Sequence, residues 1–165
     1  MIGEPKIVER TEQPYLGIRF QTPYRGMFAQ ANKQFNILNK WLRQHGVTPA
    51  GPRLLRYHVI DMAGDMDIEA GVLVAAPLPG NELVKPGRLP AGPYASLIYT
   101  GLGLAANKAL LDWIRENNLP LDKWAGPKGD AFACRYEAYL TNPKNEPRKK
   151  QWEIELAMKL AEKHP

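Results

Sequence analysis

The feature that most constrains this chain is an internal repeat, because similar segments in its two halves must adopt related structures. Residues 35–47 (FNILNKWLRQHGV) and 107–119 (NKALLDWIRENNL) both place apolar side chains at the spacing of one helix face. Trp41 aligns with Trp113, and both segments end in Gly or Asn before a loop that contains proline, a common way for a helix to end. The sequence therefore predicts two related helices, one in each half.

Three further pairs of segments follow in the same order along the chain. They are 14–20 with 93–99, 56–61 with 135–140, and 66–74 with 152–160. Each match is weak alone, but four in one order indicate an internal duplication. Each half then has the order strand, helix, strand, strand. The last segment also has helix-compatible spacing, and the repeat is what favours a strand there.

This order predicts an α+β fold in which tandem strand-helix-strand-strand repeats are related by pseudo-twofold symmetry. Residues 1–165 would form a single domain, with repeats at about 5–77 and 90–162 joined by the Gly- and Pro-rich stretch 78–93. One repeat alone would have a marginal core. Two repeats would share an antiparallel sheet with both helices on one face. The central cleft where they meet is a preferred place for a ligand.

Composition and motifs exclude several classes of protein. The net charge of +5 is scattered along the chain, which favours a solvated basic face over a nucleic-acid site. A single cysteine, Cys134, allows no intramolecular disulfide, and its apolar surroundings predict a buried thiol. Phosphate-loop, GxGxxG, HExxH and GxSxG motifs are absent from the sequence, so we expect no cofactor and no metal ion.

The layout of the chain bears on where the protein acts. No apolar run approaches the ~20 residues that cross a bilayer, and the N-terminus lacks the pattern of a secretory signal, so we expect a cytoplasmic protein with no membrane contact. The repeats occupy the chain from Pro14 to Leu160, which leaves no segment for a helix-turn-helix. We therefore expect a stand-alone domain without sequence-specific DNA binding, of unspecified oligomeric state.

Candidate site residues come from the strand alternation. On a strand at 131–140, Glu137 and Tyr139 share one face, while Cys134 and Tyr136 share the other. The repeat alignment places Tyr57 at the position of Tyr136 and His58 at that of Glu137. Glu137 could instead have a structural role and pair with Arg135, which lies on the same face of the strand.

Two further candidates are ambiguous from sequence. Glu69 lies in the middle of its predicted strand, where it could face solvent, pair with Arg53 or Arg56, or line the cleft. Trp124 lies in the loop DKWAGPKGD, where it could close the edge of the core or cover a pocket. A carboxylate among aromatic rings attracts organic cations if it is ionised, and becomes a usable general acid or base if burial raises its pKa.

Several segments together resemble the GyrI-like family of small-molecule-binding domains, which also serve as effector-binding modules of AraC-type and MerR-type multidrug regulators. They are DIEAGVLV, LPAGPYASLIYTG, the helix containing LLDWI, RYEAYLTNP and WEIEL. The resemblance covers nearly the whole chain and implies the same tandem fold, with an aromatic cleft between the repeats.

The resemblance also assigns residues. It implies that Glu137 binds lipophilic, often cationic compounds, together with Tyr99, Trp124 and Tyr139; Tyr57 is added from the repeat, and Glu69 remains a candidate. The chain departs from the family after Gly101, where relatives usually carry a Pro-Tyr-Asp-like turn and this sequence has Leu102-Gly103-Leu104. This difference bears on the size of the cleft mouth.

Three functions fit these observations. The first is binding of hydrophobic aromatic or cationic compounds in an acidic cleft, for detoxification or resistance. The second, implied by a stand-alone branch of the family, is a hydrolase that opens cyclopropane rings of DNA-alkylating natural products, with Glu137, Tyr99 and Tyr139 positioning water and substrate. The third is a protein-interaction module that contacts DNA gyrase, as the family's namesake does.

Overall fold

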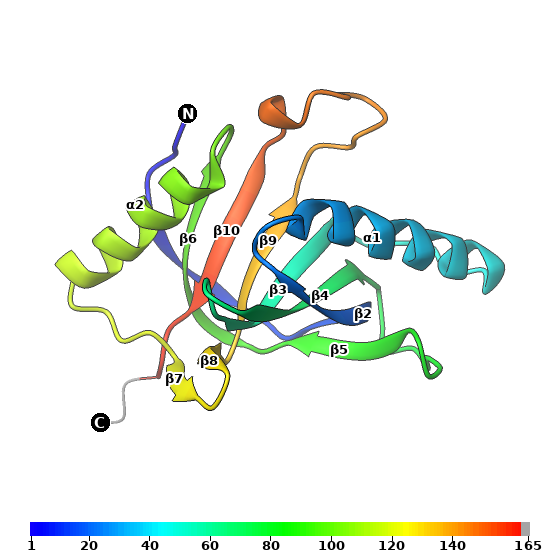
Figure 1. Ribbon diagram of the computed structural model, residues 1–165, viewed down its shortest axis with the longest axis horizontal. Helices are drawn as coiled ribbons and strands as arrows, with labels where there is room; N and C mark the ends of the chain where they lie inside the picture. Colours follow the sequence, from blue (N-terminus) through cyan, green and yellow to red (C-terminus); the bar gives the residue numbers. More distant parts are fainter. Residues whose placement is uncertain (163–165) are drawn as a thin grey trace.

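The protein is represented by a computed structural model that describes residues 1–162 and consists of two helices and a large curled sheet (Figure 1). The first half contains β1 (Lys6–Arg10), β2 (Gln13–Pro23), α1 (Met27–Gln44), β3 (Arg53–Ile60) and β4 (Asp65–Leu73). The second half contains β5 (Lys85–Leu89), β6 (Gly92–Tyr99), α2 (Gly103–Glu116), β7 (Lys123–Gly126), β8 (Gly129–Phe132), β9 (Arg135–Tyr139), the 3₁₀ turn η1 (Lys149–Gln151) and β10 (Ile154–Lys159).

The two predicted helices form for the reason that the sequence indicated. The buried residues of α2 are Ala106, Leu110 and Ile114, which lie one turn apart on a single face. Each helix is followed by a residue with positive φ, Gly46 at 65° and Asn118 at 52°. The predicted Gly and Asn helix ends are therefore confirmed, since these residue types adopt the left-handed conformation most readily.

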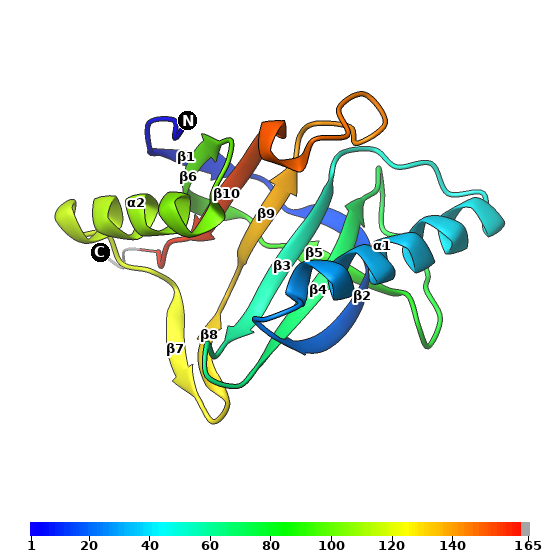
Figure 2. The same cartoon turned by 45° about the horizontal axis from the view of Figure 1, so that its top comes forward.

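All strand pairs are antiparallel, and the sheet order is β1-β6-β10-β9-β3-β4-β2-β5. The halves of the chain meet at the centre of the sheet, where β3 pairs with β9 and Leu55 lies opposite Glu137. The β7–β8 hairpin projects from one end of this central pair and attaches to β3 (Figure 2). Strands β1 and β5, which the sequence did not predict, extend the two outer edges of the sheet.

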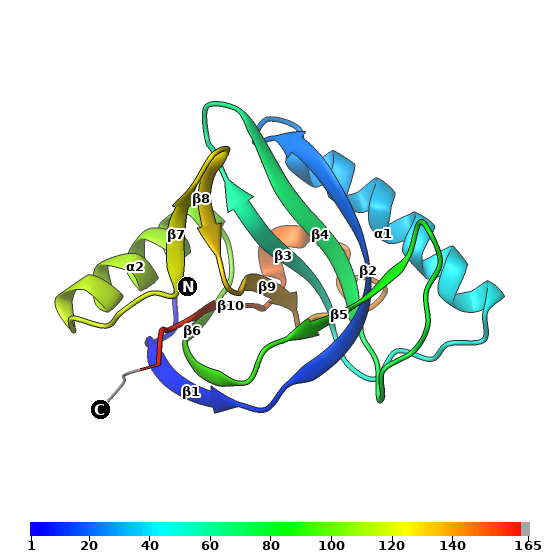
Figure 3. The same ribbon diagram turned by 90° about the horizontal axis from the view of Figure 1, so that it is seen from below.

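Both helices cover the same face of the sheet, as the view from below in Figure 3 shows. The main hydrophobic core lies between that face and the helices, and contains Phe35 from α1, Leu110 from α2, Leu55 from β3 and Leu156 from β10. A second cluster, which includes Tyr15, Tyr94, Cys134 and Tyr136, lies on the opposite face. The predicted α+β class, with an antiparallel sheet and helices on one face, is confirmed.

Two details of the predicted strands are corrected by the structure. The segment 131–140 is interrupted between β8 and β9, although residues 135–139 do alternate as expected. The repeat alignment of β3 with β9 is wrong by one residue: Tyr57 lies on the face of Glu137, not of Tyr136, because Leu55 pairs with Glu137. A slip of one residue moves every side chain to the other face of a strand.

Within residues 1–162, neither helix has the length and apolar character needed to cross a membrane.

Candidate functional site

The centre of the candidate site is a carboxylate surrounded by three phenol hydroxyls, the Glu137 cluster. Tyr57, Tyr99 and Tyr139 each donate a hydrogen bond of 3.3 Å to the carboxylate of Glu137. The residues come from three strands, β3, β6 and β9, which the fold brings together under the helices. Glu137 is only 5% exposed, so the phenols replace the water that a surface carboxylate would have.

Burial dominates the electrostatics of this cluster. Desolvation raises the pKa of Glu137 above its ordinary value, although hydrogen bonds from the three tyrosines and the charge of Arg135 act in the opposite direction. Desolvation and the nearby carboxylate also raise the pKa values of Tyr57, Tyr99 and Tyr139, so the phenols stay protonated and act as donors. Arg135 does not pair with Glu137: it donates to Asn107 Oδ1 at 2.6 Å.

Gly103, in the segment that departs from the family pattern, lies directly beside this cluster. A Cβ atom at Gly103 would lie 3.1 Å from the Tyr99 hydroxyl and 4.0 Å from Glu137 Oε1. The neighbouring Leu102 and Leu104 are exposed, at 79% and 63%. A side chain at Gly103, the first residue of α2, would therefore crowd the Tyr99 hydroxyl, and glycine avoids this contact. The leucines on either side are exposed to solvent.

Next to the Glu137 cluster lies a small aromatic cavity between α1 and η1, which we name the α1–η1 cavity. Its volume is about 10 Å³, on the order of one water molecule. The lining residues are Phe28, Ala31, Asn32, Phe35, Arg53, Leu55, Tyr139, Lys149 and Trp152. Tyr139 connects the two places, because its hydroxyl binds Glu137 and its ring lines the cavity.

A cation of the chain itself occupies the aromatic part of this cavity. The Arg53 guanidinium carbon lies 5.0 Å from the ring centroid of Phe35, 5.4 Å from that of Tyr139 and 5.2 Å from that of Trp152. Tyr139 also packs edge-on against both other rings, with centroid distances of 6.2 Å. Trp152 is held in place by a hydrogen bond from its Nε1 to the Glu146 carbonyl at 2.6 Å. The rings form a box that fits a flat cation.

The charge of the cavity differs from the sequence expectation. Its lining contains two cations, Arg53 and Lys149, and no carboxylate. Lys149 Nζ lies 3.1 Å from the ring centroid of Phe28. The lining of this cavity is therefore basic, whereas the sequence predicts an acidic cleft; Glu137 lies beside the cavity in its own shell of phenols and is absent from the lining.

Glu69 belongs to a separate cluster. Its Oε1 accepts a 2.5 Å hydrogen bond from the Tyr15 hydroxyl and lies 2.8 Å from His58 Nε2. Arg56 donates to the Tyr15 hydroxyl at 3.1 Å, and a Cβ atom at Gly17 would lie 2.9 Å from Glu69 Oε2, so glycine leaves room for the carboxylate. Although burial opposes ionisation, the bonds from His58 and Tyr15 lower the pKa of Glu69. The polar groups of this cluster therefore bind one another.

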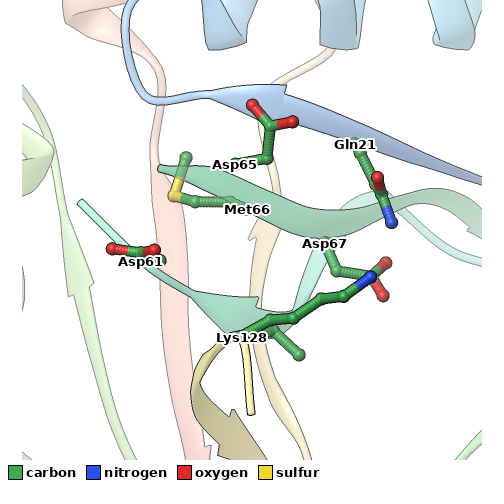
Figure 4. Close-up of a pocket in the computed structure, with 7 residues that line it drawn as sticks. Gln21, Asp61, Asp65, Met66, Asp67 and Lys128 are labelled. Atoms are coloured by element: carbon green, nitrogen blue, oxygen red, sulfur yellow. The ribbon is translucent and has the colours of Figure 1, made fainter. Parts of the chain in front are cut away.

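A larger hollow of about 340 Å³ lies where β4 begins, and Figure 4 shows its polar lining. It contains Asp61, Asp65, Asp67 and Lys128. Asp67 is already paired with Arg19 at 2.7 Å. In residues 1–162, no three acidic, histidine or cysteine side chains converge closely enough to hold a metal ion. The hollow is open and polar, and lacks the aromatic side chains that surround Glu137.

The sequence profile of the GyrI-like small molecule binding domain matches residues 3–161. The chain belongs to the GyrI-like family. A search of curated proteins found no match.

Solved structures share the GyrI-like fold of this chain at low identity. The C-terminal domain of EcmrR has a TM-score of 0.70 at 17% identity, covering 99% of this chain and 100% of that one. EcmrR in a complex with DNA has a TM-score of 0.74 at 17% identity over 97% of this chain, which spans 58% of that longer protein.

Two further structures with this fold are those of a hydrolase and of a protein with a bound ligand. A hydrolase from Listeria innocua has a TM-score of 0.58 at 13% identity, covering 96% of this chain and 92% of that one. SAV2435 bound to tetraphenylphosphonium has a TM-score of 0.53 at 12% identity, covering 96% and 94%. At these identities the likeness shows the fold alone.

The structure brings together four of the six candidate residues: Glu137, Tyr57, Tyr99 and Tyr139. Glu69 lies in its own cluster, and Trp124 lies on the β7–β8 hairpin with 55% of its surface exposed. Sequence analysis missed Arg53, Lys149 and Trp152 as site residues. Arg53 was considered only as a partner for Glu69. The alternation of β3, which places Arg53 on the same face as Leu55 and Tyr57, was the signal that could have indicated it.

Proposed function

We propose that this GyrI-like protein binds a hydrophobic aromatic small molecule at the α1–η1 cavity, with the Glu137 cluster at its inner end. The observation that carries the proposal is the box formed by the rings of Phe35, Tyr139 and Trp152. This box already holds a flat group of the chain itself, the guanidinium of Arg53, so its shape suits a flat ligand. Rings in edge-on contact favour a further flat ring by stacking as well as by burial.

The size of the cavity requires a movement on binding. A volume of about 10 Å³ accommodates no aromatic ring, so Arg53 or the η1 segment with Trp152 must move when the ligand enters. The exposed ring of Phe28, 43% accessible, extends the apolar surface outside the cavity. SAV2435 was solved with tetraphenylphosphonium, a cation whose four phenyl groups support an aromatic ligand for this fold.

The Trp152→Leu variant tests this proposal. We expect it to bind 2-naphthalenemethanol, a neutral aromatic probe, at least about 10-fold more weakly than the wild type, because one wall of the box is lost. Isothermal titration calorimetry measures the affinities. Trp124→Leu is the matched control, since Trp124 is exposed on β7 outside this site, and its affinity should equal that of the wild type. Equal affinities for both variants would place the binding site elsewhere.

A second candidate function, hydrolysis of a strained electrophile, is favoured by the Glu137 cluster. A buried carboxylate with a raised pKa can take a proton from water, and adjacent phenols can polarise an oxygen of the substrate. The fold also occurs in a protein described as a hydrolase. We expect water addition to a cyclopropane-bearing alkylator, detected by mass spectrometry, to be lost in Glu137→Gln. Stoichiometric protection of the intact compound would instead indicate binding without catalysis.

A further inference from the structure

The Arg53 guanidinium has no counter-ion in the part of the chain that the structure describes. Its contacts there are the three rings of the box, and no side-chain hydrogen bond or ion pair involves it within residues 1–162. Its Nε atom is buried and has no acceptor. A buried donor without an acceptor costs about 1–3 kcal/mol. The ring faces stabilise the charge, but they give the buried Nε–H group no oxygen acceptor.

Lys149 adds a second cation to the lining of the same cavity. Its ammonium lies over the Phe28 ring, and no acidic side chain within residues 1–162 forms an ion pair with it. Burial lowers the pKa of Lys149, the charge of Glu137 raises it, and the charge of Arg53 lowers it by a smaller amount. Both cations line the same small cavity, and an anion there would offset their charges.

We propose that the ligand of the α1–η1 cavity is an aromatic compound that carries an anionic group, such as a carboxylate or a sulfonate. The anion accepts hydrogen bonds from the Arg53 guanidinium, whose donors match two carboxylate oxygens, and pairs with Lys149. The aromatic body stacks against Trp152 and the exposed ring of Phe28. This inference rests on the proposed function, since it specifies the class of compound that the same cavity takes.

The alternatives on the molecule are weaker. Glu137 would favour a cation, but its carboxylate already accepts three phenol hydrogen bonds and does not line the cavity. An ammonium group in the α1–η1 cavity would lie beside Arg53 and Lys149, both positive, and would find no carboxylate among the lining residues. The charges that line the cavity therefore favour an anion.

A matched set of naphthalenes tests the charge preference by calorimetry. The probes are 2-naphthoate, 2-naphthalenemethanol and 2-naphthylmethylammonium, which share one ring system and differ in charge. We expect naphthoate to bind at least about 10-fold more tightly than the neutral probe, with the ammonium weakest of the three. Equal affinities for the three probes, or tightest binding of the ammonium, would overturn the inference.

Variants assign the effect to the two cations. Arg53→Gln and Lys149→Gln should each weaken naphthoate binding at least about 10-fold more than they change the binding of 2-naphthalenemethanol, because only naphthoate pairs with the charge that is removed. Lys150→Gln, a neighbouring exposed lysine that does not line the cavity, is the matched control and should leave both affinities unchanged. Lys149 lies on an exposed segment, so its variant is informative even if Arg53→Gln fails to fold.

The result separates this inference from the function on which it rests. If the neutral probe binds and Trp152→Leu weakens it, but charge makes no difference, the aromatic site stands and the anion preference is wrong. If Lys149→Gln leaves naphthoate affinity unchanged, the pairing with Lys149 is wrong. If no naphthalene binds in a way that depends on Trp152, both proposals fail together.

Discussion

The Glu137→Gln variant is expected to unfold at a temperature roughly 6 °C above that of the wild type at pH 7. Glutamine keeps the shape of Glu137 and one acceptor oxygen, while its amide NH2 can donate to a phenol oxygen, and it removes a buried charge that phenols solvate. We expect a gain of about 2 kcal/mol in the free energy of unfolding, at the upper end of what single stabilising substitutions give. For a protein of this size, 1 kcal/mol corresponds to roughly 3 °C.

The pH dependence of this gain identifies its cause. Because the folded-state pKa of Glu137 lies above the ordinary value of 4.5, its cost to folding is absent below pH 4.5 and grows as pH rises toward and through the folded pKa. The groups that face it are Tyr57, Tyr99 and Tyr139, which stay neutral, and Arg135, which stays charged. Thermal melts at pH 4 and pH 7 should therefore show a small gain at pH 4 and a larger gain at pH 7.

Glu153→Gln is the control for this experiment, because Glu153 is exposed beside the start of β10 and its melting temperature should not change. A lower melting temperature for Glu137→Gln at pH 7 would mean that the carboxylate stabilises the fold. A residue that destabilises the fold while holding three tyrosines in place is typical of a functional site.

The Glu69→Ala variant is expected to have the opposite effect, a loss of about 3 kcal/mol in the free energy of unfolding. The substitution removes the acceptor of the Tyr15 hydroxyl and the partner of His58, both within the sheet, and leaves a void beside Gly17. At roughly 3 °C for each kcal/mol, the melting temperature should fall by about 9 °C at pH 7.

The pKa of Glu69 is lowered, so its contribution to the stability of the fold depends on pH in the opposite direction to that of Glu137. The contribution is fully present above pH 4.5 and is lost as pH falls through the lower folded-state pKa. The groups that face Glu69 are His58, Tyr15 and Arg56. The difference in melting temperature between wild type and variant should therefore shrink on strong acidification.

Asp67→Ala provides the control on the same strand. Asp67 forms an ion pair with Arg19, whose side chain is 56% exposed, and such pairs contribute about 0.5 kcal/mol. A loss for Glu69→Ala no larger than that for Asp67→Ala would show that the Glu69 cluster is not the stabilising network described here.

Local periodicity determined much of this fold and part of its site. Apolar spacing gave both helices, and the Gly and Asn stops after them are confirmed by their positive φ angles. Alternation alone placed Glu137 and Tyr139 on one face of β9, because the period of a strand is two residues and needs no partner. The edge strands β1 and β5 escaped sequence analysis, since short segments with charged residues and proline carry no alternation.

Tyr57 shows how a local argument reaches its limit. The repeat alignment predicted it as a site residue from the wrong register, with Tyr57 on the face of Tyr136. The actual register is set by the pairing of Leu55 with Glu137 across the join between the two halves of the chain. Register between distant strands depends on which faces must be buried together, and a sequence comparison does not contain that information.

The sequence by itself determined the class of the fold, its helices and the carboxylate at its centre. Only the tertiary structure decided the charge of the cavity, because Arg53, Lys149 and Trp152 come from distant parts of the chain and meet where α1 and η1 approach the sheet. The tertiary structure also places Trp124 at the surface and Glu69 in a separate cluster. Periodicity fixes the face of a strand on which a side chain lies, whereas packing between distant elements decides what that face contacts.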